Sequence, residues 1–143
     1  MKVYIGSDHA GYELKELVKK HFDGGYEFVD KGTFSSDSVD YPDFAHQVAE
    51  CVLKDSDGVG ILICGTGNGM AMSANKHAGI RAALCWSPEI AALARQHNNA
   101  NILVLPARFI SIDSAMDTIK SFFKAEFEGG RHQRRIDKIN FQS

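Results

Sequence analysis

A run of glycines directly after a short apolar stretch is the part of the chain best suited to chemistry. Residues 59–63 are apolar or small, Cys64 follows them, and Gly65, Gly67 and Gly69 then alternate with polar residues. Glycine-rich backbone at the start of a helix presents N–H donors and the positive end of the helix dipole to an anion. The same environment stabilises a thiolate, so Cys64 is a candidate base or nucleophile.

Each of these features also has a plainer structural explanation. Glycines can simply permit a tight turn, and a cysteine is most often a small buried apolar residue. The dinucleotide-binding pattern fits poorly, because Met70 stands where a glycine is required and Cys85-Trp86 stands where the acid is required. A P-loop fits no better, because no Gly-Lys-Ser/Thr sequence closes the run. Three alternating glycines at a strand-to-helix junction favour an anion-binding loop.

Further polar residues follow the other predicted strands or end a predicted helix. Asp8 and His9 come after the first strand, where Asp8 could also be only a helix N-cap, and Arg108 comes after the last strand. His97 lies on an apolar helical stripe, which suits a core histidine equally well. Asn98 follows it directly and adds a polar group at that helix end.

Arginines at 131, 134 and 135 would share one face of a helix, and a solvated basic face is the usual explanation. A nucleic-acid surface is disfavoured by the small size of this patch and by the formal net charge of -2. Guanidinium groups, an amide-lined loop, a base and an imidazole together suit a proton shift next to a carbonyl in a small anionic substrate. Neither a metal nor a nucleotide is required, and the six histidines show no HExxH pair.

These residues must be positioned by an α/β fold. The 143 residues predict a single domain, residues 1–143. Strands are expected at residues 2–5, 26–29, 59–63, 80–84 and 102–105. Helical stretches separate them, so the sequence predicts right-handed βαβ units and a mostly parallel, doubly wound sheet. Apolar spacing predicts that the first helix buries Leu14, Leu17, Val18 and His21-Phe22, and that a helix capped by Ser87 and begun by Pro88 carries Ile90, Leu93 and Ala94 inward. Ligands of such sheets bind at the carboxyl ends of the strands, where most of the candidate residues lie.

Composition narrows the cellular setting. No window approaches the ~18 apolar residues of a membrane span, and no leader sequence is evident at the amino end. Three cysteines without CxxC spacing suggest neither a disulfide framework nor a zinc site. We therefore expect a cytoplasmic protein that acts without nucleic acid or membrane as a partner.

Several segments resemble one known family. They are GSDHAGYELK, DKGTFSSDSVDYPDFA, GILICGTGNGMAMSANKHAGIRAA, ARQHNNANIL and EGGRHQRR. Together they are similar to type B ribose-5-phosphate isomerases, a family that includes the galactose-6-phosphate isomerase subunits. The resemblance implies a three-layer αβα Rossmann-like sandwich with a five-stranded, mostly parallel sheet. It also implies interconversion of ribose 5-phosphate and ribulose 5-phosphate through a cis-enediolate, without a cofactor.

The resemblance assigns roles to individual residues. Cys64 matches the base that moves a proton between C2 and C1, whereas another branch of the family uses a Glu where this chain has Met70. Thr66 and His97 match residues that assist opening of the furanose ring. The remaining matches are binding residues: the loop amides of Gly65, Gly67, Asn68 and Gly69 for the enediolate oxygen, Asp8 and Asn98 for hydroxyls, Tyr41 near the site, and His9, Arg108, Arg131 and Arg135 for the phosphate.

The resemblance further implies a homodimer or homotetramer whose pockets draw on both subunits. We expect His97, or the tail from about residue 128, to serve the pocket of a neighbouring subunit. The preferred substrate is either a pentose 5-phosphate or a hexose 6-phosphate such as allose or galactose 6-phosphate. The alternatives to an isomerase are a nucleotide-binding module and a non-catalytic subunit. The residues assign no role to Arg134.

Overall fold

Strands and helices alternate along the chain, and the computed structural model describes residues 1–141. The strands are β1 (Lys2–Ser7), β2 (Glu27–Asp30), β3 (Val59–Cys64), β4 (Ala82–Leu84) and β5 (Ile102–Pro106). The helices are α1 (Tyr12–His21), α2 (Tyr41–Leu53), α3 (Asn68–Ala74), α4 (Pro88–Asn98), α5 (Ile112–Lys124) and α6 (Arg131–Asp137). None of the helices in residues 1–141 is both long and apolar enough to cross a membrane.

The strands form one sheet in the order β2-β1-β3-β5-β4, and every pairing in it is parallel. The five-stranded parallel sheet expected from the sequence is therefore confirmed. The predicted strand at residues 80–84 starts late, because the N–H of Ile80 closes a turn onto His77 and that of Arg81 donates to the Asn101 side chain. Strand order reverses between β1 and β3, which is where parallel α/β sheets bind their ligands.

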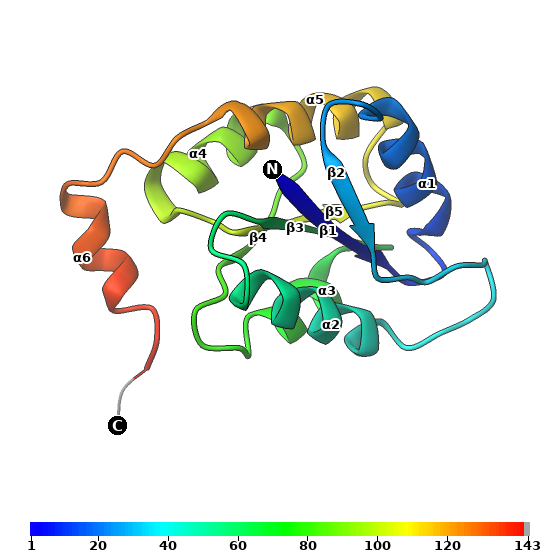
Figure 1. The fold of residues 1–143 in the computed structure, drawn as a ribbon, viewed down its shortest axis with the longest axis horizontal. Helices are drawn as coiled ribbons and strands as arrows, with labels where there is room; N and C mark the ends of the chain where they lie inside the picture. The colour runs from blue at the N-terminus through cyan, green and yellow to red at the C-terminus, as the bar shows by residue number, and fades with distance from the viewer. Residues whose placement is uncertain (142–143) are drawn as a thin grey trace.

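Helices cover both faces of the sheet, so the predicted three-layer sandwich is confirmed. Figure 1 shows α1, α4 and α5 on one face and α2 and α3 on the other. The side chains of β3 alternate between these layers: Ile61 and Ile63 join the core under α1, α4 and α5, whereas Leu62 and Cys64 join the core under α2 and α3. Cys64 thus points toward the layer that contains the helix following the glycine loop.

Two predicted core positions are wrong. Leu17 of α1 and Leu93 of α4 are 41% and 37% exposed, because small residues and a lysine take the inward-facing positions instead. In α4 the buried positions are Ala91 and Ala94, and in α1 Lys15 is fully buried beside Leu14. Both helices still pack on the sheet, but the face that each one buries is not the face that carries these leucines.

Because the sheet is parallel, the carboxyl ends of its strands all lie on one side and the amino ends on the opposite side. We call these two sides the carboxyl edge and the amino edge. The carboxyl ends of the strands carry Asp8, Cys64 and Arg108 just beyond or at their last residues. Each helix runs back across the sheet, so the last residues of α4 lie near the amino ends of the strands. Helix α6 packs against α4 and, in Figure 1, lies at the opposite end of the molecule from the carboxyl ends of β1 and β2.

Candidate active site

Cys64 is the last residue of the fully buried strand β3 and is itself 4% exposed. Its side chain shares an apolar cluster with Met70 of α3 and Val104 of β5. Its own carbonyl accepts a hydrogen bond of 2.8 Å from the N–H of Ala107, which fixes the end of the strand. The sulfur is therefore shielded from bulk water among apolar side chains, and the glycine loop begins at the next residue of the chain.

The loop after Cys64 has the shape of an anion-binding turn. Gly67 has φ +80°, a left-handed conformation that side chains rarely adopt, and a Cβ there would lie 2.3 Å from a methyl of Leu84. Within residues 1–141, the N–H groups of Gly65, Thr66 and Gly67 donate to no backbone or side-chain acceptor. The hydroxyl of Thr66, which is exposed, accepts a 3.2 Å hydrogen bond from the N–H of Asn68. These free amides could hold a developing oxyanion.

Tyr41 and Arg108 close on this loop from two sides. The Tyr41 ring lies so near Gly69 that a Cβ there would be 2.4 Å from a ring carbon. The Arg108 guanidinium lies against Gly65, 3.3 Å from where its Cβ would be, and the Arg108 N–H donates to the Gly65 carbonyl at 3.0 Å. A side chain at position 69 would collide with the Tyr41 ring, whereas one at position 65 would only crowd the Arg108 side chain, which places a cation at the mouth of the loop.

Arg108 has no carboxylate partner among residues 1–141, as the ion pairs of that region involve only Lys15, Lys19, His97 and His132 as cations. An unpaired guanidinium beside free amides suits a dianion such as a phosphate ester. This is the electrostatic arrangement that the sequence predicted for the carboxyl edge.

Asp8 and His9 border the same edge on the side of β1. The N–H of Asp8 donates to the Ile63 carbonyl at 3.2 Å, and Asp8 Oδ1 accepts from the N–H of Gly11 at 3.1 Å. Asp8 is 7% exposed. His9 Nδ1 accepts from the N–H of Val39 at 3.2 Å, so the neutral ring carries its proton on Nε2. That nitrogen is then a donor toward any anionic group at this edge.

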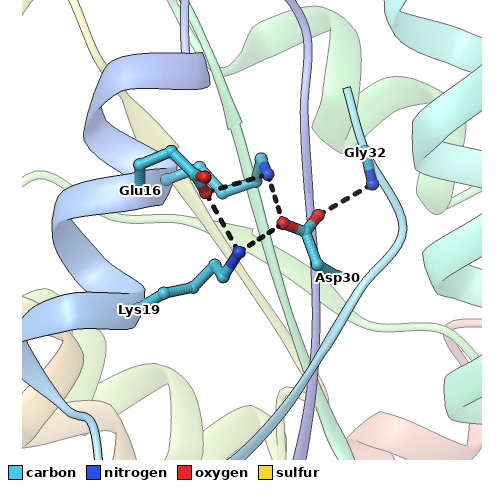
Figure 2. Close-up of polar contacts among 5 residues, drawn as sticks. Glu16, Lys19, Asp30 and Gly32 are labelled. Atoms are coloured by element: carbon cyan, nitrogen blue, oxygen red, sulfur yellow. Dashed lines mark hydrogen bonds and ion pairs between the residues drawn. The ribbon is translucent and has the colours of Figure 1, made fainter. Parts of the chain in front are cut away.

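A buried ion-pair cluster anchors the loop that holds His9 in place. Figure 2 shows Asp30 at the end of β2 accepting hydrogen bonds from Lys19 and the N–H of Gly32. Asp30 also accepts one from Lys15. The Lys15 ammonium is 2.5 Å from Asp30 Oδ2 and its side chain is fully buried. Burial opposes ionisation of Asp30, but the hydrogen bonds from Lys15 and Lys19 outweigh it and lower the pKa of the carboxyl. The ionised cluster fixes the start of the 31–40 loop.

A groove of about 450 Å³ opens at the carboxyl edge next to the loop. It is lined by Thr66, Asn68, Leu84, Trp86, Pro106 and Phe109. Trp86 and Phe109 are 58% and 73% exposed, so this wall is apolar and uncovered in the single chain.

The remaining predicted site residues lie elsewhere. His97 and Asn98 end α4, and Arg131 and Arg135 belong to α6, all toward the amino edge of the sheet. The structure therefore brings together Asp8, His9, Tyr41, Thr66 and Arg108 around Cys64 and the glycine loop, but it separates His97, Asn98 and the arginine helix from them. A single chain does not assemble the full predicted set.

Sequence reasoning missed several residues that position the site. Lys15 and Asp30 were not identified from the sequence. A lysine at position 15, on the same helical face as the buried Val18, indicates a buried ion pair. Glu128 and His132 were also missed. Glu128 Oε1 is 3.7 Å from His97 Nε2 and 3.6 Å from His132 Nε2. Within residues 1–141, these three side chains form the group whose ligand atoms lie close enough together to be considered for a metal ion.

Comparison with known proteins gives a consistent result. A profile described as Ribose/Galactose Isomerase matches residues 3–139. The chain is 51% identical over 140 residues to a probable ribose-5-phosphate isomerase B of Mycoplasma genitalium, with 96% of this chain and 92% of that protein covered. It is 45% identical over 139 residues to ribose-5-phosphate isomerase B of Escherichia coli, with 96% and 93% covered.

Solved structures agree. The Thermotoga maritima ribose 5-phosphate isomerase superposes with a TM-score of 0.94 at 54% identity, covering 96% of each chain. Ribose-5-phosphate isomerase B of Mycoplasma genitalium, solved with bound ribulose-5-phosphate, superposes with a TM-score of 0.93 at 51% identity, covering 96% of this chain and 93% of that one. Taken together with the arrangement around Cys64, these matches show that the chain belongs to the ribose/galactose isomerase family.

Proposed function

We propose that this chain is an aldose-ketose isomerase that interconverts ribose 5-phosphate and ribulose 5-phosphate. The observation that carries the proposal is the grouping at the carboxyl edge of a buried thiol with loop amides and a guanidinium that have no protein partner within residues 1–141. A relative 51% identical to this chain has been solved with ribulose-5-phosphate bound. This grouping supplies the base, the oxyanion site and the phosphate partner that such a reaction needs.

In the proposed reaction Cys64 acts as the base. Its thiolate takes the C2 proton of the open-chain aldose, and the C–H electron pair forms the C1=C2 bond as O1 becomes an oxyanion. The amides of Gly65, Thr66 and Gly67 hold that oxyanion; one such donor is typically worth about 3–4 kcal/mol. The thiol then returns the proton to C1, the 2-hydroxyl proton passes to O1, and C2 becomes the ketone. A single base over one face can serve both carbons.

Binding of the phosphate falls to His9 and Arg108 within the chain. His9 presents its Nε2–H, and Arg108 presents a guanidinium free of any carboxylate in residues 1–141. Asp8 is placed to accept hydrogen bonds from sugar hydroxyls at the same edge. The Tyr41 ring covers Gly69 at the end of the same loop.

We further propose that the enzyme is a cytoplasmic homodimer, or a pair of such dimers. His97, Asn98, Arg131 and Arg135 lie too far along the sheet to reach Cys64 of their own chain. In a symmetric dimer the amino edge of one protomer can face the carboxyl edge of its partner, so these residues would complete the partner's pocket. His97 would then assist ring opening, and the arginines of α6 would add to the phosphate site.

The direct test is isomerisation by the purified chain alone. Ribose 5-phosphate, allose 6-phosphate and galactose 6-phosphate are supplied in parallel, and ketose formation is followed. We expect the highest kcat/KM with ribose 5-phosphate. A clear preference for a hexose phosphate would move the substrate assignment within the family. No turnover of any of them, with a melting temperature raised by NAD or AMP but not by ribose 5-phosphate, would favour a nucleotide-binding module instead.

A further inference from the structure

A carboxylate lies beside the Nε2 atoms of two stacked imidazoles where α4 meets the tail. The His97 and His132 rings are 4.4 Å apart and only 13° from parallel. Glu128 Oε1 is 3.7 Å from His97 Nε2 and 3.6 Å from His132 Nε2. The backbone N–H of Glu128 donates to the Gln96 carbonyl at 3.0 Å, which places the residue next to the end of α4. His132 is 9% exposed, so the stack has a fixed inner member.

The ring geometry argues against a metal at this cluster. The lone pair of an imidazole nitrogen lies in the plane of its ring, and a zinc ion bound by histidine sits about 2.0–2.1 Å along it. Nearly parallel rings at 4.4 Å keep their two lone pairs from converging on one such point. Without rotation of a ring, the group cannot ligate one ion through both histidines. The arrangement instead suits the control of a proton.

A carboxylate facing Nε2 selects between the tautomers of His97. An ionised carboxylate is an acceptor only, whereas a neutral imidazole carries one N–H and one lone pair. At 3.6–3.7 Å the contacts exceed an ordinary hydrogen bond, and the side chains of His97 and Glu128 are 42% and 52% exposed, so Glu128 acts through a charge that water partly screens. That charge attracts an N–H and repels a lone pair, which favours the proton on Nε2 and leaves Nδ1 free.

We propose that Glu128 is a positioning residue for His97, holding its ring against His132 in the Nε2–H tautomer so that Nδ1 can accept a proton from substrate. The inference rests on the proposed function, in which His97 assists ring opening. It assigns to the segment between α5 and α6 a part in the reaction that neither the motif nor the glycine loop indicates.

The chemistry that depends on Glu128 is confined to the cyclic sugar. In ring opening, Nδ1 of His97 takes the proton of the C1 hydroxyl, the C1–O4 bond breaks, C1 becomes an aldehyde, and O4 receives a proton from the imidazolium. Glu128 stabilises that transient cation across the contact to Nε2. Ribulose 5-phosphate cannot form the corresponding ring, because its C5 oxygen carries the phosphate. Exchange of its C1 hydrogen with solvent therefore needs Cys64 but not His97.

The experiment compares Glu128→Ala with Glu126→Ala in the full-length enzyme. Glu126 is an exposed carboxylate on the same segment and forms no ion pair in the described part of the chain. Three quantities are measured: kcat for ribose 5-phosphate, wash-in of solvent deuterium at C1 of ribulose 5-phosphate, and the His97 tautomer from ¹⁵N ring shifts.

For Glu128→Ala we expect a fall in kcat with ribose 5-phosphate of about fivefold or more, smaller than the ~10²–10⁴-fold that an acid-base group itself commonly contributes, because Glu128 acts only through His97. Deuterium wash-in should change less than twofold, and the His97 ring should lose its Nε2–H preference. Glu126→Ala should match the wild type throughout. An unchanged tautomer, or equal losses in isomerisation and wash-in, would overturn the proposal. If wild-type enzyme fails to isomerise ribose 5-phosphate, the proposed function fails instead, and the tautomer measurement still decides the role of Glu128.

Discussion

Replacing Asp30 by Asn removes the anion that neutralises a fully buried lysine. The Lys15 ammonium is 2.5 Å from Asp30 Oδ2, and the rings of Tyr12 and Phe34 lie 5.4 and 5.3 Å from it. Asn keeps the size of the side chain but loses the charge and replaces one of its two acceptor oxygens by an NH2 donor, although Asp30 Oδ2 accepts from both lysines and Oδ1 from the Gly32 N–H. The perturbation therefore tests the ion pair together with its hydrogen bonds, with little change in packing.

The cost follows from what Lys15 retains. Removing one partner of a buried pair typically costs about 3–5 kcal/mol, because the other charge is left uncompensated. Lys15 keeps Glu16 at 3.3 Å, but the Glu16 side chain is 42% exposed and so compensates only in part. We expect the lower end, about 3 kcal/mol, which for a chain of this length corresponds to a fall of roughly 6–12 °C in Tm.

Urea and thermal unfolding at pH 7 measure this cost. The control is the double variant Lys15→Met, Asp30→Asn, in which no buried charge is orphaned; it should recover most of the loss. If the free energy of unfolding of Asp30→Asn lies within about 1 kcal/mol of the wild-type value, the loss is well below the usual range for a buried pair and the reasoning is refuted. A double variant as unstable as the single one would refute it too.

The same ion pair predicts a pH dependence. The pKa of Asp30 is lowered in the folded protein, where hydrogen bonds from both lysines outweigh the effect of burial. A lowered carboxyl pKa gives stability that is present above the unfolded value and is lost as pH falls through the folded value. The stability difference between wild type and Asp30→Asn should therefore hold at neutral pH and close in acid, below the ordinary carboxyl pKa of 3.8.

Three further predictions concern site residues and the buried Cys85. Arg108→Ala should raise KM for ribose 5-phosphate about tenfold or more with a smaller effect on kcat, since a charged hydrogen bond is worth roughly 1.5–3 kcal/mol; an unchanged KM would remove Arg108 from the phosphate site. Burial raises the pKa of the Cys85 thiol to about 12, so native protein at pH 8 should resist alkylation at Cys85 by mass spectrometry, and rapid labelling there would contradict its burial. Mixing the inactive variants Cys64→Ala and His97→Ala after subunit exchange should restore about a quarter of wild-type activity, because random pairing gives half heterodimers with one intact pocket each; no recovery would mean that the pocket is not shared.

The fold was predictable because its signals are local and repeated. Apolar runs such as 59–63, with helical stretches between them, require a parallel sheet with helices on both faces. Ser87 and Pro88 likewise marked the start of α4, where the Ser87 side chain accepts from the Ile90 N–H. Periodicity could not say which stripe faces inward, so Leu17 and Leu93 were assigned to the core. Which face of a helix is buried depends on the residues that it packs against. In α1, for example, the buried Lys15 pairs with Asp30 of β2.

The candidate site was predictable only where its residues follow strands. Asp8, Cys64 and Arg108 meet because parallel strands end at one edge. No such pattern places His97 and Arg135, because their distance from Cys64 depends on where they lie along helices α4 and α6. Contacts between segments distant in sequence, such as Val39 with His9 and Glu128 with His97, were equally invisible. The assembly of two chains is a further step that spacing within one sequence does not encode.

The central claim, that Cys64 is the base, is tested most directly by Cys64→Ala. Solvent deuterium wash-in at C1 of ribulose 5-phosphate reports proton abstraction without ring opening, and ribose 5-phosphate binding and Tm serve as controls for folding. We predict a variant that folds and binds substrate but shows neither wash-in nor isomerisation above background. Wash-in within tenfold of the wild-type rate would contradict the assignment and place the base elsewhere at the carboxyl edge.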